Sequence, residues 1–404
     1  MHSSGENPVK TKPLITNSFL EPIFKLSAHH TTPKREILGG ITTFLTMAYI
    51  IFVNPNILGD AGMDKGALIT VTCLAAFLGT VLVGFWANVP FAMGPGMGLN
   101  AFFTYTLVIG QDVNWETALG VVFISGIFFL LLTFSGFREK IVNAIPFSLR
   151  IAVAAGMGLF IAFIGFQNLG LVVQNPATLV GLGEFGPTVI LGLMGLIVMA
   201  ILEVRKVKGS LLIGIVITTI LGVFLGQIDF PEKVISLPPS IEPLAFQLDI
   251  FSAFNLGLMG AIFSFMFVDL FDSVGTIVAC AHEAGLTNEK GEVKRIGRIL
   301  TADALASIFG AILGTSTTTT FVESASGIGN GARTGLAALS TAFLFLLALF
   351  FTPLIGMVPA YATAPALIIV GVMMFRNVRL IELEDFTIAI PAFMTIILMP
   401  LTYS

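Results

Sequence analysis

Two carboxylates three residues apart stand inside a long apolar stretch of this chain. They are Asp269 and Asp272, in the run FVDLFDSVGT. On a helix, a spacing of three places both side chains close to one face. Two acids this close in a low-dielectric site cannot both ionise cheaply, so we expect at least one to hold a proton. The alternative is a pair of capping or water-solvated acids near a helix end.

A third acid, Glu323, lies in the polar stretch GTSTTTTFVESASGIGNG between two oily segments. The β-branched residues Thr317 to Thr320 favour a short extended piece. The small residues after Glu323 favour the start of a helix with a carboxylate in its first turn. Acids at membrane depth are costly, so function is the default interpretation. The alternative is a structural carboxylate bonded to facing threonines or amides.

A second broken segment reads FAMGPGMGLNAFF, residues 91–103. Pro95 removes an amide donor, and each of the glycines around it, up to Gly98, costs about 1 kcal/mol in a helix relative to Ala. Non-helical backbone at membrane depth is tolerated only where it lines a cavity or is buried in protein. We therefore expect a break here, with a short extended piece, and the start of a half-helix near Asn100. The alternative is a glycine-rich helix-packing surface.

A fourth acid, Asp303, lies about two helical turns from the basic residues Arg295 and Arg298. It is either a coupling residue or an interfacial acid paired to those arginines, and the sequence leaves both open. The histidines have no second ligand at metal spacing, and no glycine run is followed by the Lys-Ser/Thr of a phosphate loop. We therefore predict no metal site and no cofactor.

The elements that must position these residues are membrane helices. The mean hydropathy is +0.95 and only 11% of the 404 residues are charged, against roughly a quarter in a soluble domain. A bilayer core takes about 20 apolar residues per helix, which leaves room for about a dozen spans or more. The runs are too long and continuous for barrel strands, so the composition predicts an all-α polytopic membrane protein.

Apolar runs bounded by Pro, Gly and charge predict thirteen segments, of which the third and the tenth are the short broken ones. With the N-terminus in the cytosol, all of the twenty Lys and Arg except Lys65 and Lys233 fall on the cytosolic side, which supports both the orientation and the segment count. We expect residues 1–36 to be a cytosolic arm and the first span to be retained, since the arm holds no apolar run of signal-peptide length. The predicted segments are 37–58, 66–87, 92–108, 116–135, 147–166, 187–204, 210–226, 257–281, 298–314, 316–330, 333–352, 359–375 and 386–402.

A linker without a span, residues 227–256, divides these segments into seven and six. The broken segment is the third of each half, which indicates an inverted repeat with a binding site near the membrane midplane. An inverted repeat needs an odd number of spans in each half. We therefore expect a fourteenth span that is missing from the end of this chain.

Six motifs, in this order, resemble one known family: GGITTFLTMAYIIFVNPNIL, GPGMGLNAFF, FVDLFDSVGT, TADA, ESASGIGNGARTGL and PLIGMVPAYATAPALIIVGVMM. From about residue 22 onward the chain is similar to the AzgA-type purine permeases, a branch of the nucleobase/cation symporters related to the nucleobase-ascorbate transporters. The resemblance implies a 7+7 inverted-repeat fold. A core domain would contain residues 37–135 and 257–352. A gate domain with a homodimer interface would contain residues 147–226 and 359–404.

The resemblance also implies roles for single residues. Asn100, Asp269 and Glu323 match purine-contacting positions, Asp272 matches an acid needed for transport, and Asp303 matches a polar position tied to the proton or to site geometry. Which of Asp269 and Asp272 touches the base stays open. The aromatic residues near enough in sequence to stack on the base are Phe102, Phe103, Phe267 and Phe321. The predicted substrate-binding set is Asn100, Asp269, Glu323, Gly98, Phe102, Thr320 and Phe321, and the predicted proton-coupling set is Asp272, Asp269 and Asp303.

The chemistry of the residues agrees with this resemblance. A purine presents ring N–H and amine donors that acceptor-only carboxylates and an Asn amide can match, while backbone amides at the breaks could meet its ring nitrogens and carbonyl. The sequence therefore predicts a proton-coupled importer of hypoxanthine, guanine or adenine, and not an enzyme. It would work by alternating access in the plasma membrane, which in a bacterium is the inner membrane. Its partners would be the purine nucleobase, a proton, membrane lipid and a second copy bound through the gate, with no nucleic acid.

Two other functions were weighed against this one. A sulfate- or bicarbonate-type anion carrier could share the fold, but an anion site between half-helix N-termini would not favour Glu323 and two aspartates around it. An intramembrane aspartyl protease could use Asp269 or Asp272 with Asp303, but the Gly-x-Gly-Asp segment that such enzymes carry is absent.

Overall fold

The computed structural model describes residues 20–135, 146–288 and 292–402. Most of the predicted cytosolic arm, residues 1–19, lies outside the described residues. The arm's remainder contains the short helix α1 (Glu21–Phe24), which is followed by the first membrane helix. In this described part of the chain, nine helices are long and apolar enough to cross a membrane.

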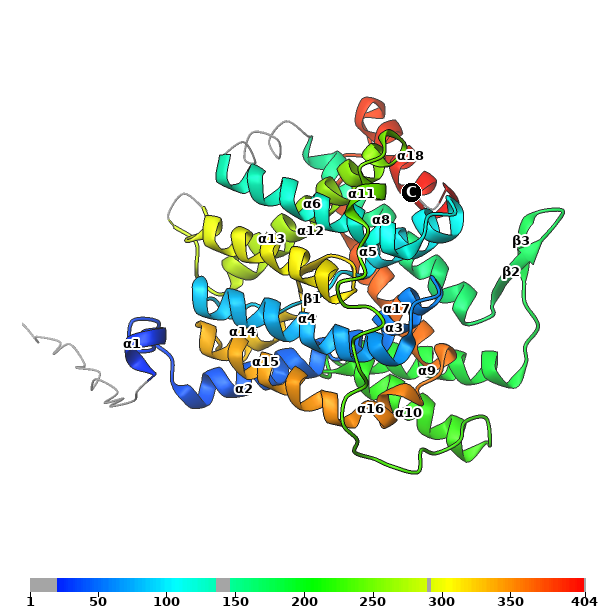
Figure 1. The fold of residues 1–404 in the computed structure, drawn as a ribbon, viewed down its shortest axis with the longest axis horizontal. Coiled ribbons are helices and arrows are strands. Elements are labelled where there is room, and N and C mark those ends of the chain that lie inside the picture. The colour runs from blue at the N-terminus through cyan, green and yellow to red at the C-terminus, as the bar shows by residue number, and fades with distance from the viewer. Residues whose placement is uncertain (1–19, 136–145, 289–291, 403–404) are drawn as a thin grey trace, which may run out of the picture.

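The first half of the chain follows the predicted segments closely. The first span bends after Met47, where α2 gives way to α3, and the third segment is broken into a strand, a helix turn and a π-helix. A hairpin of β2 and β3, which the sequence did not predict, projects from the bundle between α8 and α9 (Figure 1). The elements are α2 (Pro33–Met47), α3 (Ile50–Gly59), α4 (Lys65–Trp86), β1 (Met93–Pro95), α5 (Met97–Ala101), η1 (Phe102–Gly110), α6 (Trp115–Ser135), α8 (Phe147–Asn168), β2 (Val172–Asn175), β3 (Leu179–Leu182), α9 (Pro187–Val204) and α10 (Ser210–Phe224).

The second half repeats this order of long, long and broken segments. The predicted linker carries the short helix α11 and no span, and the eleventh segment is divided by a turn of 3₁₀-helix. The elements are α11 (Ile250–Ala253), η2 (Leu256–Leu258), α12 (Met259–Glu283), α13 (Ile296–Leu313), β4 (Thr318–Thr320), α14 (Ser324–Gly329), α15 (Gly335–Ala348), η3 (Leu349–Phe351), α16 (Thr352–Gly356), α17 (Ala360–Phe375), η4 (Arg376–Leu380) and α18 (Phe386–Thr402).

The helices pack as two groups. In the first group α4 lies against α3, α13 and α15, and α6 lies against α13, so the two halves of the chain interleave; these helices run side by side in Figure 1. We call α2–α6 with α12–α16 the core bundle. In the second group α8 packs on α17 and α18, and α9 packs on α10 and α17. We call α8–α10 with α17 and α18 the gate bundle.

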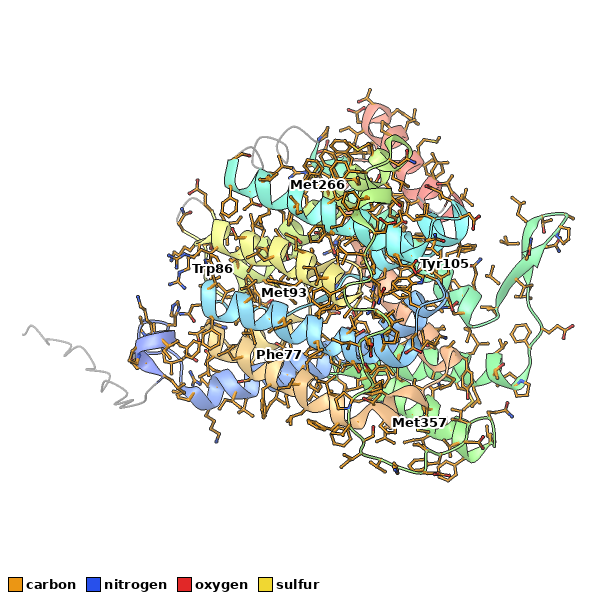
Figure 2. All side chains as sticks on the ribbon, in the orientation of Figure 1. Phe77, Trp86, Met93, Tyr105, Met266 and Met357 are labelled. Carbon is orange, nitrogen blue, oxygen red and sulfur yellow. The ribbon has the colours of Figure 1, made fainter. Side chains whose placement is uncertain are left out.

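The two broken segments meet inside the core bundle. β1 and β4 pair as antiparallel strands, with Met93 opposite Thr320 and Pro95 opposite Thr318. Figure 2 shows Met93 near the middle of the bundle, whereas Trp86 and Met357 lie toward its edges. Both strands are buried, which satisfies the requirement that irregular backbone at membrane depth be covered by protein. The predicted extended pieces in the third and tenth segments are therefore confirmed.

Each strand is held by a hydroxyl from the long helix before it. Thr80 Oγ1 on α4 accepts from the Met93 amide at 2.9 Å and donates to the Met93 carbonyl at 3.1 Å. Ser307 Oγ on α13 accepts from the Thr318 amide at 3.2 Å and donates to the Thr318 carbonyl at 3.1 Å. α4 is the second span of its half and α13 the second span of the other, so the bracing hydroxyls are equivalent parts of an inverted repeat.

Candidate functional site

Glu323 stands at the point where β4 has ended and α14 begins. It is half-buried, and its Oε1 accepts a hydrogen bond of 2.6 Å from the hydroxyl of Tyr49 at the bend of the first span. The Glu323 carbonyl accepts from Thr46 Oγ1 at 3.4 Å. The carboxylate is therefore attached to the first span by a side chain, while part of it stays accessible.

Asp303 is fully buried and holds the end of β4. Its Oδ1 accepts from the amide and from the hydroxyl of Thr320, both at 3.2 Å, and its Oδ2 accepts from Ser273 on α12. Arg295, the cation proposed as its interfacial partner, donates instead to the carbonyls of Ala87 and Asn88. Asp303 thus acts within the core bundle as a brace between α12, α13 and β4.

Asp269 and Asp272 differ in exposure, as their spacing on α12 allows. Asp269 is buried, and its Oδ2 accepts a hydrogen bond of 3.3 Å from Ser307, the hydroxyl that braces β4. Asp272 is half-buried, and the charges of Asp303 and Glu323 act on it. Of these two aspartates, Asp272 is the more open to a ligand.

Asn100 belongs to a different polar network. Its Nδ2 donates to Asn54 Oδ1, and Asn54 Nδ2 donates to Thr72 at 2.7 Å and to Thr315 at 3.2 Å. Both asparagines are fully buried in the core bundle. Asn100 Oδ1 has no hydrogen-bond partner within the described residues. The structure therefore brings the four acids and Thr320 together around β4, and it holds Asn100 with the polar residues of α3 and α4.

Backbone amides at the breaks are largely used inside the protein. The sequence predicted that they would be offered to a ligand. Instead, the strand amides donate to Thr80, Ser307 and Asp303, and amides beside the strands donate to neighbouring backbone or to Ser324. The amides engaged in this way are those of Ala92, Met93, Gly96, Thr318, Thr320, Phe321 and Ser324. The amides at the starts of the half-helices, those of Met97, Gly98, Val322 and Glu323, are not among the ones engaged in the described part of the chain, so for them an offer to a ligand stays a prediction.

A cavity of about 520 Å³ lies between the core and gate bundles; it is lined by Phe267, Val268 and Phe271 of α12, but none of the four acids nor Asn100 is among its lining residues. Two of the predicted stacking residues, Phe102 and Phe267, line it. Phe103 is packed in the apolar interior, and Phe321 is almost fully buried beside Gly94. The cavity-lining residues are Leu99, Phe102, Thr106, Gln111, Val153, Met157, Phe160, Gly257, Gly260, Ala261, Phe263, Ser264, Phe267, Val268, Phe271 and Met399.

Gly98 lies where the two bundles touch. A Cβ added there would overlap the side chain of Met157 on α8, so glycine allows this approach of α5 to the gate without displacing that methionine. The residue predicted to bind substrate thus has a packing role in this structure, next to the cavity.

Sequence reasoning missed Tyr49, Ser273 and Ser307, which hold three of the four acids. Tyr49 did carry a signal, because a tyrosine in an apolar run must find a partner for its hydroxyl when it is buried. The serines carried none, since a lone serine in a membrane helix commonly bonds to its own backbone.

Comparison with protein families and with named proteins adds to this geometry. A family model described as "Permease family" matches residues 34–404. Among individual proteins, the chain is 49% identical to a putative permease of Methanocaldococcus jannaschii, with 96% of this chain and 89% of the relative covered. It is 45% identical to the adenine permease AdeP of Escherichia coli, with 95% and 86% covered. It is 46% identical to the guanine/hypoxanthine permease PbuG of Bacillus subtilis, with 95% and 90% covered.

Solved structures share the fold at much lower identity. The transmembrane domain of the cyanobacterial bicarbonate transporter BicA superposes with a TM-score of 0.70 at 18% identity, covering 91% of this chain and 95% of that one. Murine Slc26a9, an anion transporter, superposes with a TM-score of 0.63 at 10% identity, covering 98% and 70%. The predicted 7+7 inverted-repeat transporter fold is therefore confirmed.

Proposed function

The chain belongs to the permease family that matches it, and we propose that it carries a purine nucleobase across the membrane together with a proton. The names of its relatives AdeP and PbuG support adenine, guanine and hypoxanthine as the first substrates to test. The likeness to anion carriers is one of fold alone, because the identities are 18% and 10%.

One observation carries the proposal: inside a membrane protein, the half-buried carboxylate of Glu323 lies at a strand-to-helix break, and a second half-buried carboxylate, Asp272, lies on α12, which packs against β4 and α14. Carboxylates accept hydrogen bonds only, and a purine presents N–H donors along its edge. The same acids disfavour an inorganic anion, which would be repelled by Asp272, Asp303 and Glu323 together. A neutral heteroaromatic base is the small ligand that this site suits best.

Asp272 is our candidate for the group that carries the proton. It is more exposed than Asp269, and two further acids, Asp303 and Glu323, act on it, so protonation would relieve repulsion within the cluster. In the outward-facing state Asp272 would take a proton and the base would then bind. The core bundle would move against the gate bundle, and both would be released to the cytosol.

Asp269, Asp303, Thr320 and Asn100 enter this proposal in supporting roles. Their bonds to Ser307, Ser273 and Asn54 hold the strands and half-helices in place around the ligand. We further propose that the protein resides in the plasma membrane, with its N-terminus in the cytosol and a second copy bound through the gate.

Uptake into proteoliposomes tests the transported substrate. Labelled hypoxanthine is offered with an excess of unlabelled adenine, guanine, uracil or sulfate, with and without a protonophore. We expect purines to compete, sulfate to have no effect, and the protonophore to abolish accumulation above equilibrium. Competition by sulfate, with none by purines, would overturn the proposal.

The variant Asp272→Asn tests the coupling role. Asparagine keeps the size of the side chain but carries no titrating proton, so we expect residual binding of the base and no accumulation against a gradient. Glu283→Gln is the matched control, because Glu283 is an exposed acid at the far end of the same helix. Uphill uptake by Asp272→Asn at the wild-type level would remove Asp272 from the coupling step.

A further inference from the structure

Tyr49 is a buried residue, and the hydroxyl group of its side chain reaches Glu323 in the candidate site. It lies between α2 and α3, at the bend of the first span, and its side chain has no exposed surface. The hydroxyl donates to Glu323 Oε1 at 2.6 Å, across 274 positions of sequence. A buried phenol needs a partner for its hydroxyl, and this one has a carboxylate.

The contact restricts how the Glu323 side chain can turn. The Tyr49 ring is fixed within an apolar cluster that includes Met97 and Phe321, so its hydroxyl has little freedom to follow a moving partner. Thr46, one helical turn earlier, lies 3.4 Å from the Glu323 carbonyl, but its hydroxyl is closer to the carbonyls of Thr43 and Thr42 in its own helix, so Tyr49 makes the stronger contact. With one carboxylate oxygen held by the first span, the direction of the other carboxylate oxygen is restricted.

We propose that Tyr49 is a positioning residue: it holds Glu323 Oε1 so that Oε2 is presented to an N–H group of the purine. This inference rests on the proposed function and adds a residue that does not touch the base itself. A single flexible glutamate would lose side-chain entropy when it bound the base. A glutamate already held by Tyr49 has lost most of that freedom beforehand.

The first test is the binding of adenine, guanine and hypoxanthine to the purified full chain, measured by calorimetry on the wild type and on Tyr49→Phe. Phenylalanine keeps the ring and its packing and removes only the hydroxyl. We expect the dissociation constant of the transported base to rise up to about tenfold, because the glutamate side chain must then be ordered when the base binds. The melting temperature without base is measured alongside, so that a loss of stability is separated from the loss of affinity.

Tyr361→Phe is the matched control. The Tyr361 hydroxyl has no hydrogen-bond partner among the described residues, and it lies in the gate bundle beside Gly222. Its removal should leave the dissociation constant unchanged. Equal losses of affinity in both variants would mean that removing any tyrosine hydroxyl weakens binding, and this would overturn the role of Tyr49.

A second measurement separates positioning from general packing. Hypoxanthines methylated singly at each ring nitrogen are compared on the wild type and on Tyr49→Phe. The derivative that lacks the N–H facing Glu323 should bind both proteins equally, whereas the other derivatives that bind should lose up to about tenfold on the variant. A uniform loss for every ligand would show that Tyr49 only packs.

The inference and the proposed function fail in different ways. A wild-type protein that binds none of the three purines would overturn the proposed function. A wild-type protein that binds purine while Tyr49→Phe binds it equally well would overturn only the positioning role.

Discussion

β1 and β4 are each held at both the amide and the carbonyl of one residue by a single hydroxyl, Thr80 for β1 and Ser307 for β4. The surroundings of these hydroxyls differ. One helical turn before Ser307 stands Asp303, whereas one turn before Thr80 stands Ala76, and both are fully buried. The first repeat is therefore braced by a neutral hydroxyl alone, and the second repeat adds a carboxylate to the same place.

The residues that follow the two strands also differ in charge, and again the second repeat carries the carboxylate. Three residues beyond Thr320, the last residue of β4, the chain presents the carboxylate of Glu323. Three residues beyond Pro95, the last residue of β1, it presents Gly98, against which Met157 of the gate packs. Both repeats thus share the same backbone frame. The second repeat adds the carboxylates, and the first repeat adds the close contact with the gate bundle.

Removing Asp303 should have the largest effect on stability. In Asp303→Ala the Thr320 amide, the Thr320 hydroxyl and Ser273 lose their acceptor, and each buried group left unsatisfied costs about 1–3 kcal/mol. We expect a loss of about 3 kcal/mol or more, seen as a clear fall in the melting temperature in detergent. Asp303→Asn keeps acceptor capacity and should lose much less. A melting temperature of Asp303→Ala equal to that of the wild type would contradict the bracing role.

Removing either bracing hydroxyl should cause the next largest loss of stability, and the two losses should be similar. Thr80→Val keeps the shape of the side chain and Ser307→Ala removes little volume, so both variants chiefly remove two backbone hydrogen bonds. We expect each to cost about 1–3 kcal/mol. Ser307→Ala should cost somewhat more, because the one proton of this hydroxyl is shared between the Thr318 carbonyl at 3.1 Å and Asp269 Oδ2 at 3.3 Å, and both acceptors lose it. Melting curves of the two variants, measured side by side, check this, and a large loss in only one of them would show that the repeats are braced differently.

Much of this comparison could be predicted from the sequence. Hydropathy and the Gly-Pro and Thr-rich interruptions located both breaks, and the threonines of 317–320 predicted the extended piece of β4, because these signals are local in the chain. The sequence also predicts that Asp269, Asp272 and Glu323 converge, but it predicts Asn100 among them and leaves the place of Asp303 open.

The partners within the site could not be predicted. Asn100 and Glu323 hold similar places in sequence, yet Asn100 pairs with Asn54 and Glu323 with Tyr49. Which partner each finds depends on the depth and rotation of the first span against the half-helices. Those quantities are set by packing between residues far apart in sequence, such as Gly39 of α2 against Ala332, and hydrophobic periodicity carries no information about them.

A substitution at Gly98 should have the next largest effect, and it should lower the transport rate more than the stability. In Gly98→Ala the new methyl overlaps Met157, a flexible side chain that can move aside at some cost. We expect the maximal transport rate to fall about tenfold, a barrier of about 1.4 kcal/mol, while binding of the base changes little. The second-site change Met157→Ala should restore the rate. Failure of that rescue would show that Gly98 is required for backbone conformation or for direct contact with the base.

A polar contact between the bundles lies at the far end of α14. Lys208, just before α10 of the gate, donates to Asn330, whose amide also donates to Thr42 of α2 at 2.6 Å. The lysine is exposed, and an exposed bond to a long flexible side chain contributes at most about 1 kcal/mol. We therefore expect Lys208→Ala to change the transport rate by less than about fivefold, with Lys206→Ala as the matched exposed control. A larger loss confined to Lys208→Ala would mean that α14, the half-helix of the second repeat, also depends on a specific contact with the gate, as α5 does through Gly98. The gate contact would then not be confined to the first repeat.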